Sequence, residues 1–235
     1  MTSANNYAKM EEHARNLFLS HDQEEILRTW RPEHDDDYFY FTYIGRRYRL
    51  CRRTAVITPV SGSENEVCES VSDGEDFLTV PGTGGAAAKR PDTFGVSLAL
   101  FDLLSRGGPI PARSGEWKLT SAFAGAISSG HDPLLSNMSQ AAELDHHLPA
   151  LRRRLQELGG EPMDMGDVSF VIPVIELPSL QPPLRVWVQF WSADEDFPAS
   201  LRFLWEASMT QFLHYETLWY VMTDVISDLK AHTIP

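Results

Sequence analysis

The chain has 235 residues with 33 acidic and 20 basic side chains, a formal net charge of −13 at pH 7 and a pI near 5.0. Because phosphate backbones are bound by net basic surfaces, this balance excludes a general nucleic-acid-binding protein. A hydrophobic fraction of 43% can build a packed core, which excludes global disorder. No stretch approaches ~20 consecutive apolar residues, so no membrane association is predicted.

The N-terminal third predicts two helices followed by a β-hairpin. Apolar residues recur at helical spacing over residues 4–19, and Asp22 can cap a second helix that ends near Trp30. Alternating patterns over residues 38–44 and 47–53, separated by Gly45, predict the hairpin. A third strand is expected over residues 55–60.

The charges of this region fall in blocks. Residues 38–60 hold five arginines and no acid, whereas residues 61–78 hold six acids and no base. One interpretation is a solvated strand face beside a solvated loop. The alternative is a face that binds an anion or a partner protein through Arg47, Arg49 and Arg53.

Helices and strands alternate in blocks along the remainder of the chain. Residues 81–85 are a glycine-rich connector, and residues 109–137 are expected to be irregular. Leucines recur at helical spacing from residue 144 to residue 158, and Pro149 should split this helix. Helices are predicted over residues 92–106, from residue 139 to the glycines at 159–160, and over 216–230; strands are predicted over residues 168–175, 184–191 and 201–205.

This order predicts an α+β fold, with a mostly antiparallel or mixed sheet and helices packed on one side of it. The length suits a single domain over residues 1–235. The connector near residues 81–90 could divide an N-terminal part from the rest.

The usual catalytic and cofactor motifs are missing. Residues 82–85 lack the Gly-Lys-Ser/Thr ending of a phosphate loop, and no Gly-x-Ser-x-Gly elbow occurs. The adjacent His146 and His147 point about 100° apart on a helix, so they do not form a metal pair. We therefore name no catalytic residue, no metal site and no cofactor.

The two cysteines, Cys51 and Cys68, match neither a disulfide framework nor a zinc spacing. We interpret them as two reduced thiols. Together with the N-terminus, which carries no apolar signal core, they predict a cytoplasmic protein.

The densest local feature joins tryptophans to acids. Trp187 and Trp191 end a predicted strand that runs into Asp194, Glu195 and Asp196 and then Phe-Pro. One interpretation is a strand end followed by a solvated acidic turn. The other is an aromatic-walled pocket, to which Trp117 contributes, with the carboxylates at its mouth.

Several stretches resemble a bacterial family described only as a domain of unknown function, DUF3786. They include residues 116–120, 174–177, 186–191, 193–199 and 204–208, and the resemblance extends over residues 95–230. The acidic turn followed by Phe-Pro-Ala is its most specific part, and Glu206 stands where many members carry aspartate. The resemblance implies a soluble, cytoplasmic bacterial protein and no particular activity.

Three functions are compatible with these features. The leading hypothesis is a non-enzymatic accessory protein that binds an unknown small molecule or protein through Trp117, Trp187, Trp191 and residues 194–196. The second is a hydrolase that uses Asp194 and Asp196, with His131 and a divalent ion. The third is a protein–protein adaptor that uses the arginine hairpin.

Overall fold

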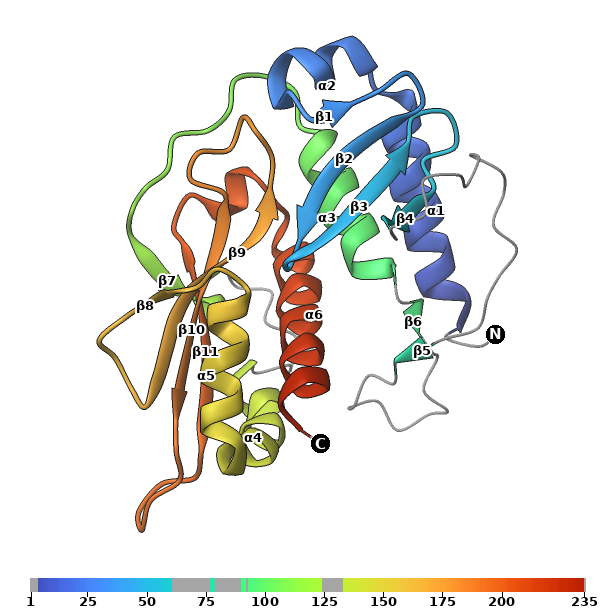
Figure 1. The fold of residues 1–235 in the computed structure, drawn as a ribbon. Helices are drawn as coiled ribbons and strands as arrows, with labels where there is room; N and C mark the ends of the chain where they lie inside the picture. Colours follow the sequence, from blue (N-terminus) through green and yellow to red (C-terminus); the bar gives the residue numbers. More distant parts are fainter. Residues whose placement is uncertain (1–3, 61–76, 79–89, 92, 124–132, 235) are drawn as a thin grey trace. The chain divides into compact units, whose positions relative to one another are not determined.

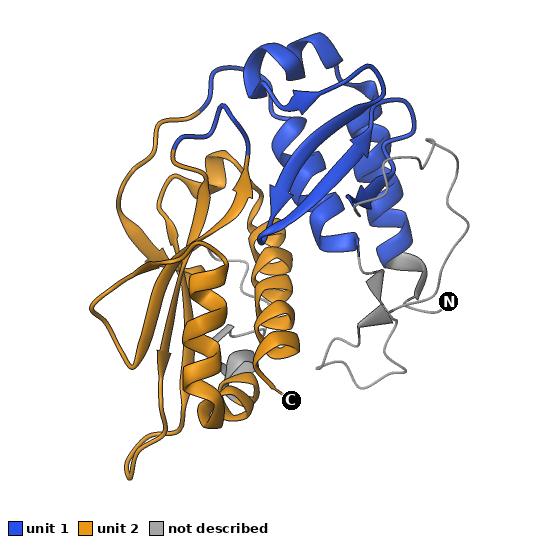
Figure 2. Cartoon of the chain, in the orientation of Figure 1, with its two compact units in different colours: residues 1–110, 177–181 blue, residues 111–176, 182–235 orange. Residues whose placement is uncertain are grey.

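The computed structural model of the protein describes residues 4–60, 77–78, 90–91, 93–123 and 133–234. These residues form two compact units (Figure 2): unit 1 contains residues 1–110 and 177–181, and unit 2 contains residues 111–176 and 182–235. Within the predicted connector near residues 81–90, residues 81–89 lie outside the described part of the chain. In both units the described strands pair antiparallel, which confirms the α+β class.

Unit 1 combines helices with a small antiparallel sheet. Strands β1 to β4 pair in chain order, and β5 pairs with β6 separately. The elements are α1 (Ala4–Ser20), α2 (Gln23–Trp30), β1 (Glu33–His34), β2 (Tyr38–Tyr43), β3 (Arg46–Cys51), β4 (Ile57–Pro59), β5 (Phe77–Leu78), β6 (Arg90–Pro91) and α3 (Phe94–Leu104). The two N-terminal helices, the hairpin and the third strand are confirmed.

The β2–β3 hairpin turns on two residues in the left-handed region. Ile44 and Gly45 have φ values of 46° and 69°, and Tyr43 pairs directly with Arg46. These values match a two-residue type I′ turn, whose twist fits the twist of the flanking strands. A β-branched residue is unusual there. Ile44 is nevertheless 6% exposed, so its burial offsets the backbone strain.

Helix α3 is buried on nearly every side. Ten of its eleven residues are buried. Its rings pack against α1: Phe101 lies 5.4 Å from Phe18 and Phe94 lies 5.1 Å from Tyr7, measured between ring centroids. A helix that is apolar all round belongs inside a core, and α3 is the central helix of unit 1.

Cys51 departs from the predicted reduced thiol. It lies at the end of β3, is 1% exposed and is disulfide-bonded. The other cysteine, Cys68, lies outside the described residues. Reduced thiols therefore no longer support a cytoplasmic location.

Unit 2 contains a five-stranded antiparallel sheet in the order β8-β9-β10-β11-β7. Its elements are β7 (Trp117–Leu119), η1 (Thr120–Phe123), α4 (Pro133–Leu144), η3 (Asp145–His147), α5 (Leu148–Glu157), β8 (Glu161–Pro162), β9 (Val168–Glu176), β10 (Leu184–Trp191), β11 (Ser200–Glu206), η4 (Met209–Gln211) and α6 (Tyr215–Thr233). The three long strands and the last helix are confirmed.

Strand β7 corrects the expectation that residues 109–137 are irregular. It has three residues, too few to show an alternating pattern, and it is held by pairing with β11. Helix α4 also begins within this segment, at Pro133, six residues before the predicted start at Ser139. Tertiary pairing and packing, which a local pattern does not register, decide both elements.

The helix with the leucines at 144–158 is split as predicted. Helix α4 ends at Leu144, and α5 begins at Leu148 with Pro149 in its first turn, where proline is tolerated. At its other end, the Gly159 N–H donates to the Gln156 carbonyl and the Gly160 N–H to the Leu155 carbonyl. This is the Schellman arrangement, with Gly159 at φ 77°.

The helices of unit 2 cover one side of its sheet (Figure 1). Helix α4 packs against β11, α5 packs against β9, and α6 packs on α5. Arg154 of α5 holds Asp228 of α6 through two hydrogen bonds of 2.8 and 2.7 Å. No helix in the described part of the chain is long and apolar enough to span a bilayer.

Candidate functional site

Strand β10 separates a core face from an aromatic face. Val186, Val188 and Phe190 are fully buried toward the helices. Alternation places Trp187 and Trp191 on the opposite face, where both are partly exposed. The tryptophans of the predicted strand therefore do not build the core; they face away from it.

Trp117 and Trp187 meet on this face. Trp117 belongs to β7 and Trp187 to β10, and β11 lies between the two strands, so the rings meet over β11. Their centroids are 5.8 Å apart with an interplanar angle of 76°, the edge-to-face geometry that aromatic pairs favour. The Trp187 indole N–H donates to Ser169 Oγ at 2.8 Å, which fixes the ring orientation. We call these two residues the tryptophan pair.

Trp191 lies apart from the tryptophan pair. It is four residues beyond Trp187 on the same strand, roughly 13 Å away at the usual rise per residue. The Arg202 guanidinium lies 4.7 Å from its ring centroid. Gly166 packs so closely on the Trp191 ring that a Cβ there would lie 3.1 Å from a ring carbon.

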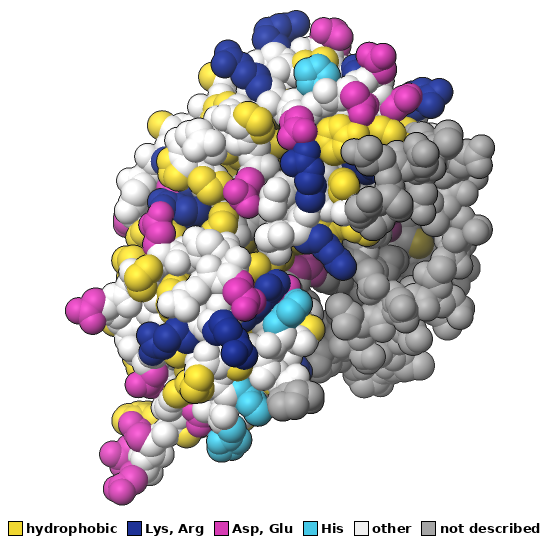
Figure 3. All heavy atoms as spheres, in the orientation of Figure 1, with side chains coloured by type: hydrophobic (Ala, Val, Ile, Leu, Met, Phe, Trp, Pro, Cys, Tyr) yellow, Lys and Arg dark blue, Asp and Glu magenta, His cyan; other side chains and the backbone are white. Residues whose placement is uncertain are grey.

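The acidic residues Asp194, Glu195 and Asp196 form the exposed tip of the β10–β11 hairpin. Asp194 Oδ1 accepts hydrogen bonds from the backbone N–H groups of Asp196 and Phe197, at 2.9 and 2.7 Å. Figure 3 shows acidic side chains gathered at this tip, at the lower left of the view. The structure thus brings Trp117 and Trp187 together but leaves the three acids at a distance from them.

A carboxylate beside the tryptophan pair is Glu206, which is not among the site residues predicted from the sequence. It pairs with Trp117 across β7 and β11 and is 2% exposed. Arg113 holds it through two hydrogen bonds, Nε to Oε2 at 2.8 Å and Nη2 to Oε1 at 2.5 Å. The same arginine donates through Nη1 to the backbone carbonyls of Pro182 and Pro183.

Two arginines keep Glu206 ionised. Burial alone raises the pKa of this carboxyl group, but the hydrogen bonds and charge of Arg113, the charge of Arg185 and the Gly115 N–H outweigh it. The pKa of Glu206 therefore lies below its ordinary value. Glu206 acts as a fixed negative charge that positions the two guanidinium groups.

Arg185 links this ion pair to the aromatic rings. Its guanidinium carbon lies 6.0 Å from the centroid of the Trp117 ring, and its Nη2 lies 3.6 Å from Glu206 Oε1. The sequence contains a signal for Arg185: it precedes Trp187 by two residues, so the two side chains lie on the same face of the strand. Arg113 gave no such signal, since it lies in a loop whose fold is set by distant residues.

The arginine hairpin of unit 1 is paired within its own unit. Arg47 contacts Glu33 at 2.6 Å, and Arg53 contacts Asp37 at 3.1 Å. Arg49 lies over the Tyr38 ring at 4.8 Å and donates to Thr58 Oγ1. The described acidic partners come from residues 33–37, whereas residues 61–76 of the predicted acidic block lie outside the described part.

Tyr40 is held by Asp35, one of the acidic residues at 33–37, and the pKa of its hydroxyl can be measured. Its hydroxyl donates to Asp35 Oδ2 at 2.7 Å, and this bond raises the pKa of Tyr40 to about 12. We expect ultraviolet titration to show a tyrosine ionising near pH 12 that Asp35→Asn shifts downward. Since the folded pKa exceeds the unfolded value of 10.0, this bond stabilises fully below pH 10 and is lost as the pH rises through about 12. Asp36→Asn, one residue away, is the control; an unchanged curve in Asp35→Asn would contradict the assignment.

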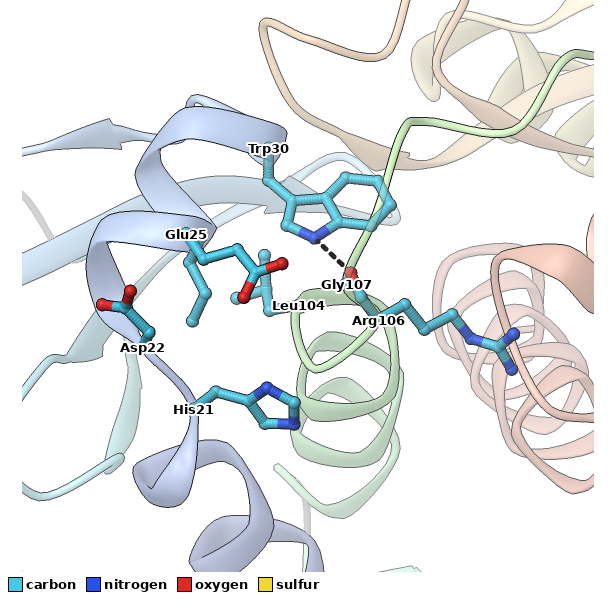
Figure 4. A pocket seen from close by; sticks show the side chains of 8 residues that line it. His21, Asp22, Glu25, Trp30, Leu104, Arg106 and Gly107 are labelled. Atoms are coloured by element: carbon cyan, nitrogen blue, oxygen red, sulfur yellow. Dashed lines mark hydrogen bonds between the residues drawn. The ribbon is translucent and has the colours of Figure 1, made fainter.

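A small pocket in unit 1 involves none of the predicted residues (Figure 4). His21, Asp22, Glu25, Trp30, Leu104, Arg106 and Gly107 surround it, together with Ile26. The Trp30 indole N–H donates to the Arg106 carbonyl at 3.3 Å and closes one side. The pocket has room for about one water molecule.

Metal ligands do not cluster in the described residues: no group of three His, Cys, Asp or Glu side chains is placed to hold an ion there. His131, the predicted partner of Asp194 in the hydrolase hypothesis, lies outside the described part of the chain.

Comparison with known proteins identifies one family. The profile of the family described as "Domain of unknown function (DUF3786)" matches residues 79–228, which include β7, β10, β11 and the tryptophan pair. Neither the curated proteins nor the solved structures give a match. The match covers more than half of the chain and agrees with the resemblance found in the sequence, so the chain belongs to the DUF3786 family.

Proposed function

We propose that this protein is a non-enzymatic ligand-binding or accessory protein, and that its ligand binds on the tryptophan pair of unit 2. The observation that carries the proposal is the contact between Trp117 and Trp187, which lie on two strands separated by β11. Both rings stay partly exposed although the opposite face of the same sheet is fully packed. Exposed aromatic side chains beside fixed charges are typical of binding surfaces.

The charges around the pair favour binding over catalysis. Glu206 is ionised and both of its oxygens accept hydrogen bonds from Arg113, so it is poorly suited to accept or donate a proton. At the hairpin tip, Asp194 is engaged by two backbone N–H groups. The hydrolase hypothesis, with Asp194, Asp196 and His131, remains the alternative among enzymes.

The adaptor hypothesis remains the alternative among protein-binding roles. Arg47 is 46% exposed and Arg53 is 69% exposed, so both can reach a partner despite their contacts with Glu33 and Asp37. Surface ion pairs of this kind are weak and exchange readily. Pull-down partners that are unchanged after charge reversal of these arginines would argue against this role.

The cellular setting is also a proposal. A bacterial, cytoplasmic location rests on the family resemblance, because the disulfide at Cys51 removes the argument from reduced thiols.

Ligand-observed NMR with a library of aromatic fragments tests the binding site. We expect wild-type protein to give saturation-transfer signals that Trp187→Ala and Trp117→Ala reduce by about tenfold or more, since each truncation removes one ring of the pair. Trp191→Ala is the matched control, because this ring lies on the same face beyond the pair. Equal loss in all three variants, or no loss in any, would contradict the assigned site.

A further inference from the structure

The two arginines beside the tryptophan pair differ in their spare hydrogen-bonding capacity. Arg113 uses all three of its nitrogens, on Glu206 and on the carbonyls of Pro182 and Pro183. Arg185 makes a single hydrogen bond in the described part of the chain, from Nη1 to Glu161 Oε2 at 3.4 Å. Its Nε is buried without a hydrogen-bond partner there. Arg185 therefore has spare hydrogen-bonding capacity, and Nη1, which among the described residues is held only by Glu161, is the nitrogen that a further anionic partner can reach.

The Glu161 carboxylate that Arg185 contacts is easily displaced. The Glu161 side chain is 71% exposed and lies on the two-residue strand β8. An exposed ion pair at 3.4 Å contributes little to stability, because water screens it. A ligand carboxylate can thus replace Glu161 on Arg185 without disturbing Glu206, which Arg113 holds independently.

The distances also indicate a spacing between ring and acid group that fits the site. The Arg185 guanidinium carbon lies 6.0 Å from the Trp117 ring centroid, and the Trp187 centroid lies 5.8 Å from that of Trp117. Because the guanidinium lies this close to the Trp117 ring, a ligand whose acid group is joined to a flat ring through one or two carbons can contact both. A planar guanidinium matches a carboxylate with two parallel hydrogen bonds, and indole faces stack on flat rings.

We infer that the tryptophan pair and Arg185 form a site for aromatic carboxylic acids, with the ligand ring on Trp117 and Trp187 and its carboxylate on Arg185 in place of Glu161. This inference rests on the proposed function, since it names the class of ligand for the same site.

The test compares ligands that differ only in charge. Indole-3-acetate and indole-3-acetamide are titrated into the full chain, with binding followed by ligand-observed NMR and calorimetry. We expect the acid to bind the wild type about tenfold more tightly than the amide, as a charge-assisted hydrogen bond implies. Arg185→Gln should remove this preference, so that acid and amide bind with equal affinity.

Two further variants complete the test. Arg202→Gln is the matched control, because Arg202 stacks on Trp191 on the same sheet face, and it should keep the preference for the acid. Glu161→Gln should strengthen binding of the acid about threefold by removing the competing carboxylate. Since Glu161 is exposed, this variant decides the question even if Arg185→Gln does not fold.

The outcomes separate the two proposals. Equal binding of acid and amide by the wild type, an unchanged preference in Arg185→Gln, or no gain in Glu161→Gln overturns the carboxylate inference and leaves the binding site intact. Absence of binding by both ligands and by all other aromatic fragments, or binding that Trp187→Ala does not change, overturns the proposed function itself.

Discussion

Replacement of Glu206 by glutamine is expected to lower the free energy of unfolding by about 3 kcal/mol. Glu206 is 2% exposed and receives two hydrogen bonds from Arg113, whose side chain is 18% exposed. The substitution keeps the shape of the side chain but removes its charge. A largely buried guanidinium then has no neutralising partner, which is the costly part of breaking such a pair. Chemical denaturation at pH 7 measures the loss.

The pH dependence gives an independent check on this ion pair. Because the folded pKa of Glu206 is lowered, the pair contributes its full stabilisation above the unfolded value of 4.5 and loses it as the pH falls through the folded pKa. The difference between wild type and Glu206→Gln should therefore shrink below pH 4.5. Glu161→Gln is the control and should cost less than about 1 kcal/mol, since its carboxylate is exposed. A constant difference between wild type and Glu206→Gln across the acid range would contradict the assigned charge state.

Two tryptophans on neighbouring strands of the same sheet should respond very differently to truncation. Trp205 is fully buried, and its indole N–H donates to Thr120 Oγ1 at 3.0 Å. Trp205→Ala leaves a cavity and an unmade hydrogen bond, so we expect a loss of about 3–5 kcal/mol. Trp191 lies on the aromatic face beneath Arg202 and packs on Gly166, so Trp191→Ala should cost less, about 1–2 kcal/mol, through the lost cation–π contact and the lost packing.

Thermal and urea unfolding of the two variants measure this contrast. Trp205→Ala should also weaken ligand binding, because Thr120 directly follows β7 and its hydroxyl donates to the Phe203 carbonyl of β11, which helps to hold Trp117 in place. Similar losses of stability in both variants would show that the assignment of core and outer faces is incorrect.

The sequence predicted the long elements of this protein because their signals are local. The alternation over residues 38–53, the strands near 168–175, 184–191 and 201–205, and the break at Pro149 all depend on neighbours within a few residues. Strand β7 was not predicted, because a strand of three residues is too short to show a recognisable alternation of apolar and polar residues. Residues 194–196 are close to the tryptophans in sequence, which predicts that they share a pocket. In the extended strand, however, each residue adds about 3.3 Å, so Trp187 lies far from the hairpin tip that carries these acids.

The sequence by itself determined the α+β class, the family and the presence of Trp117 and Trp187 among the candidate residues. Only the tertiary structure decided which carboxylate and which arginines accompany them. Glu206, Arg113 and Arg185 are far apart along the chain, and they converge because β10, β11 and a preceding loop meet at one end of the sheet. Burial strengthens the attraction between these charges, because little water is present to screen the two arginines from the ionised Glu206. The strand alternation places Arg185 on the face of Trp187, but no local pattern brings Arg113 and Glu206 to it.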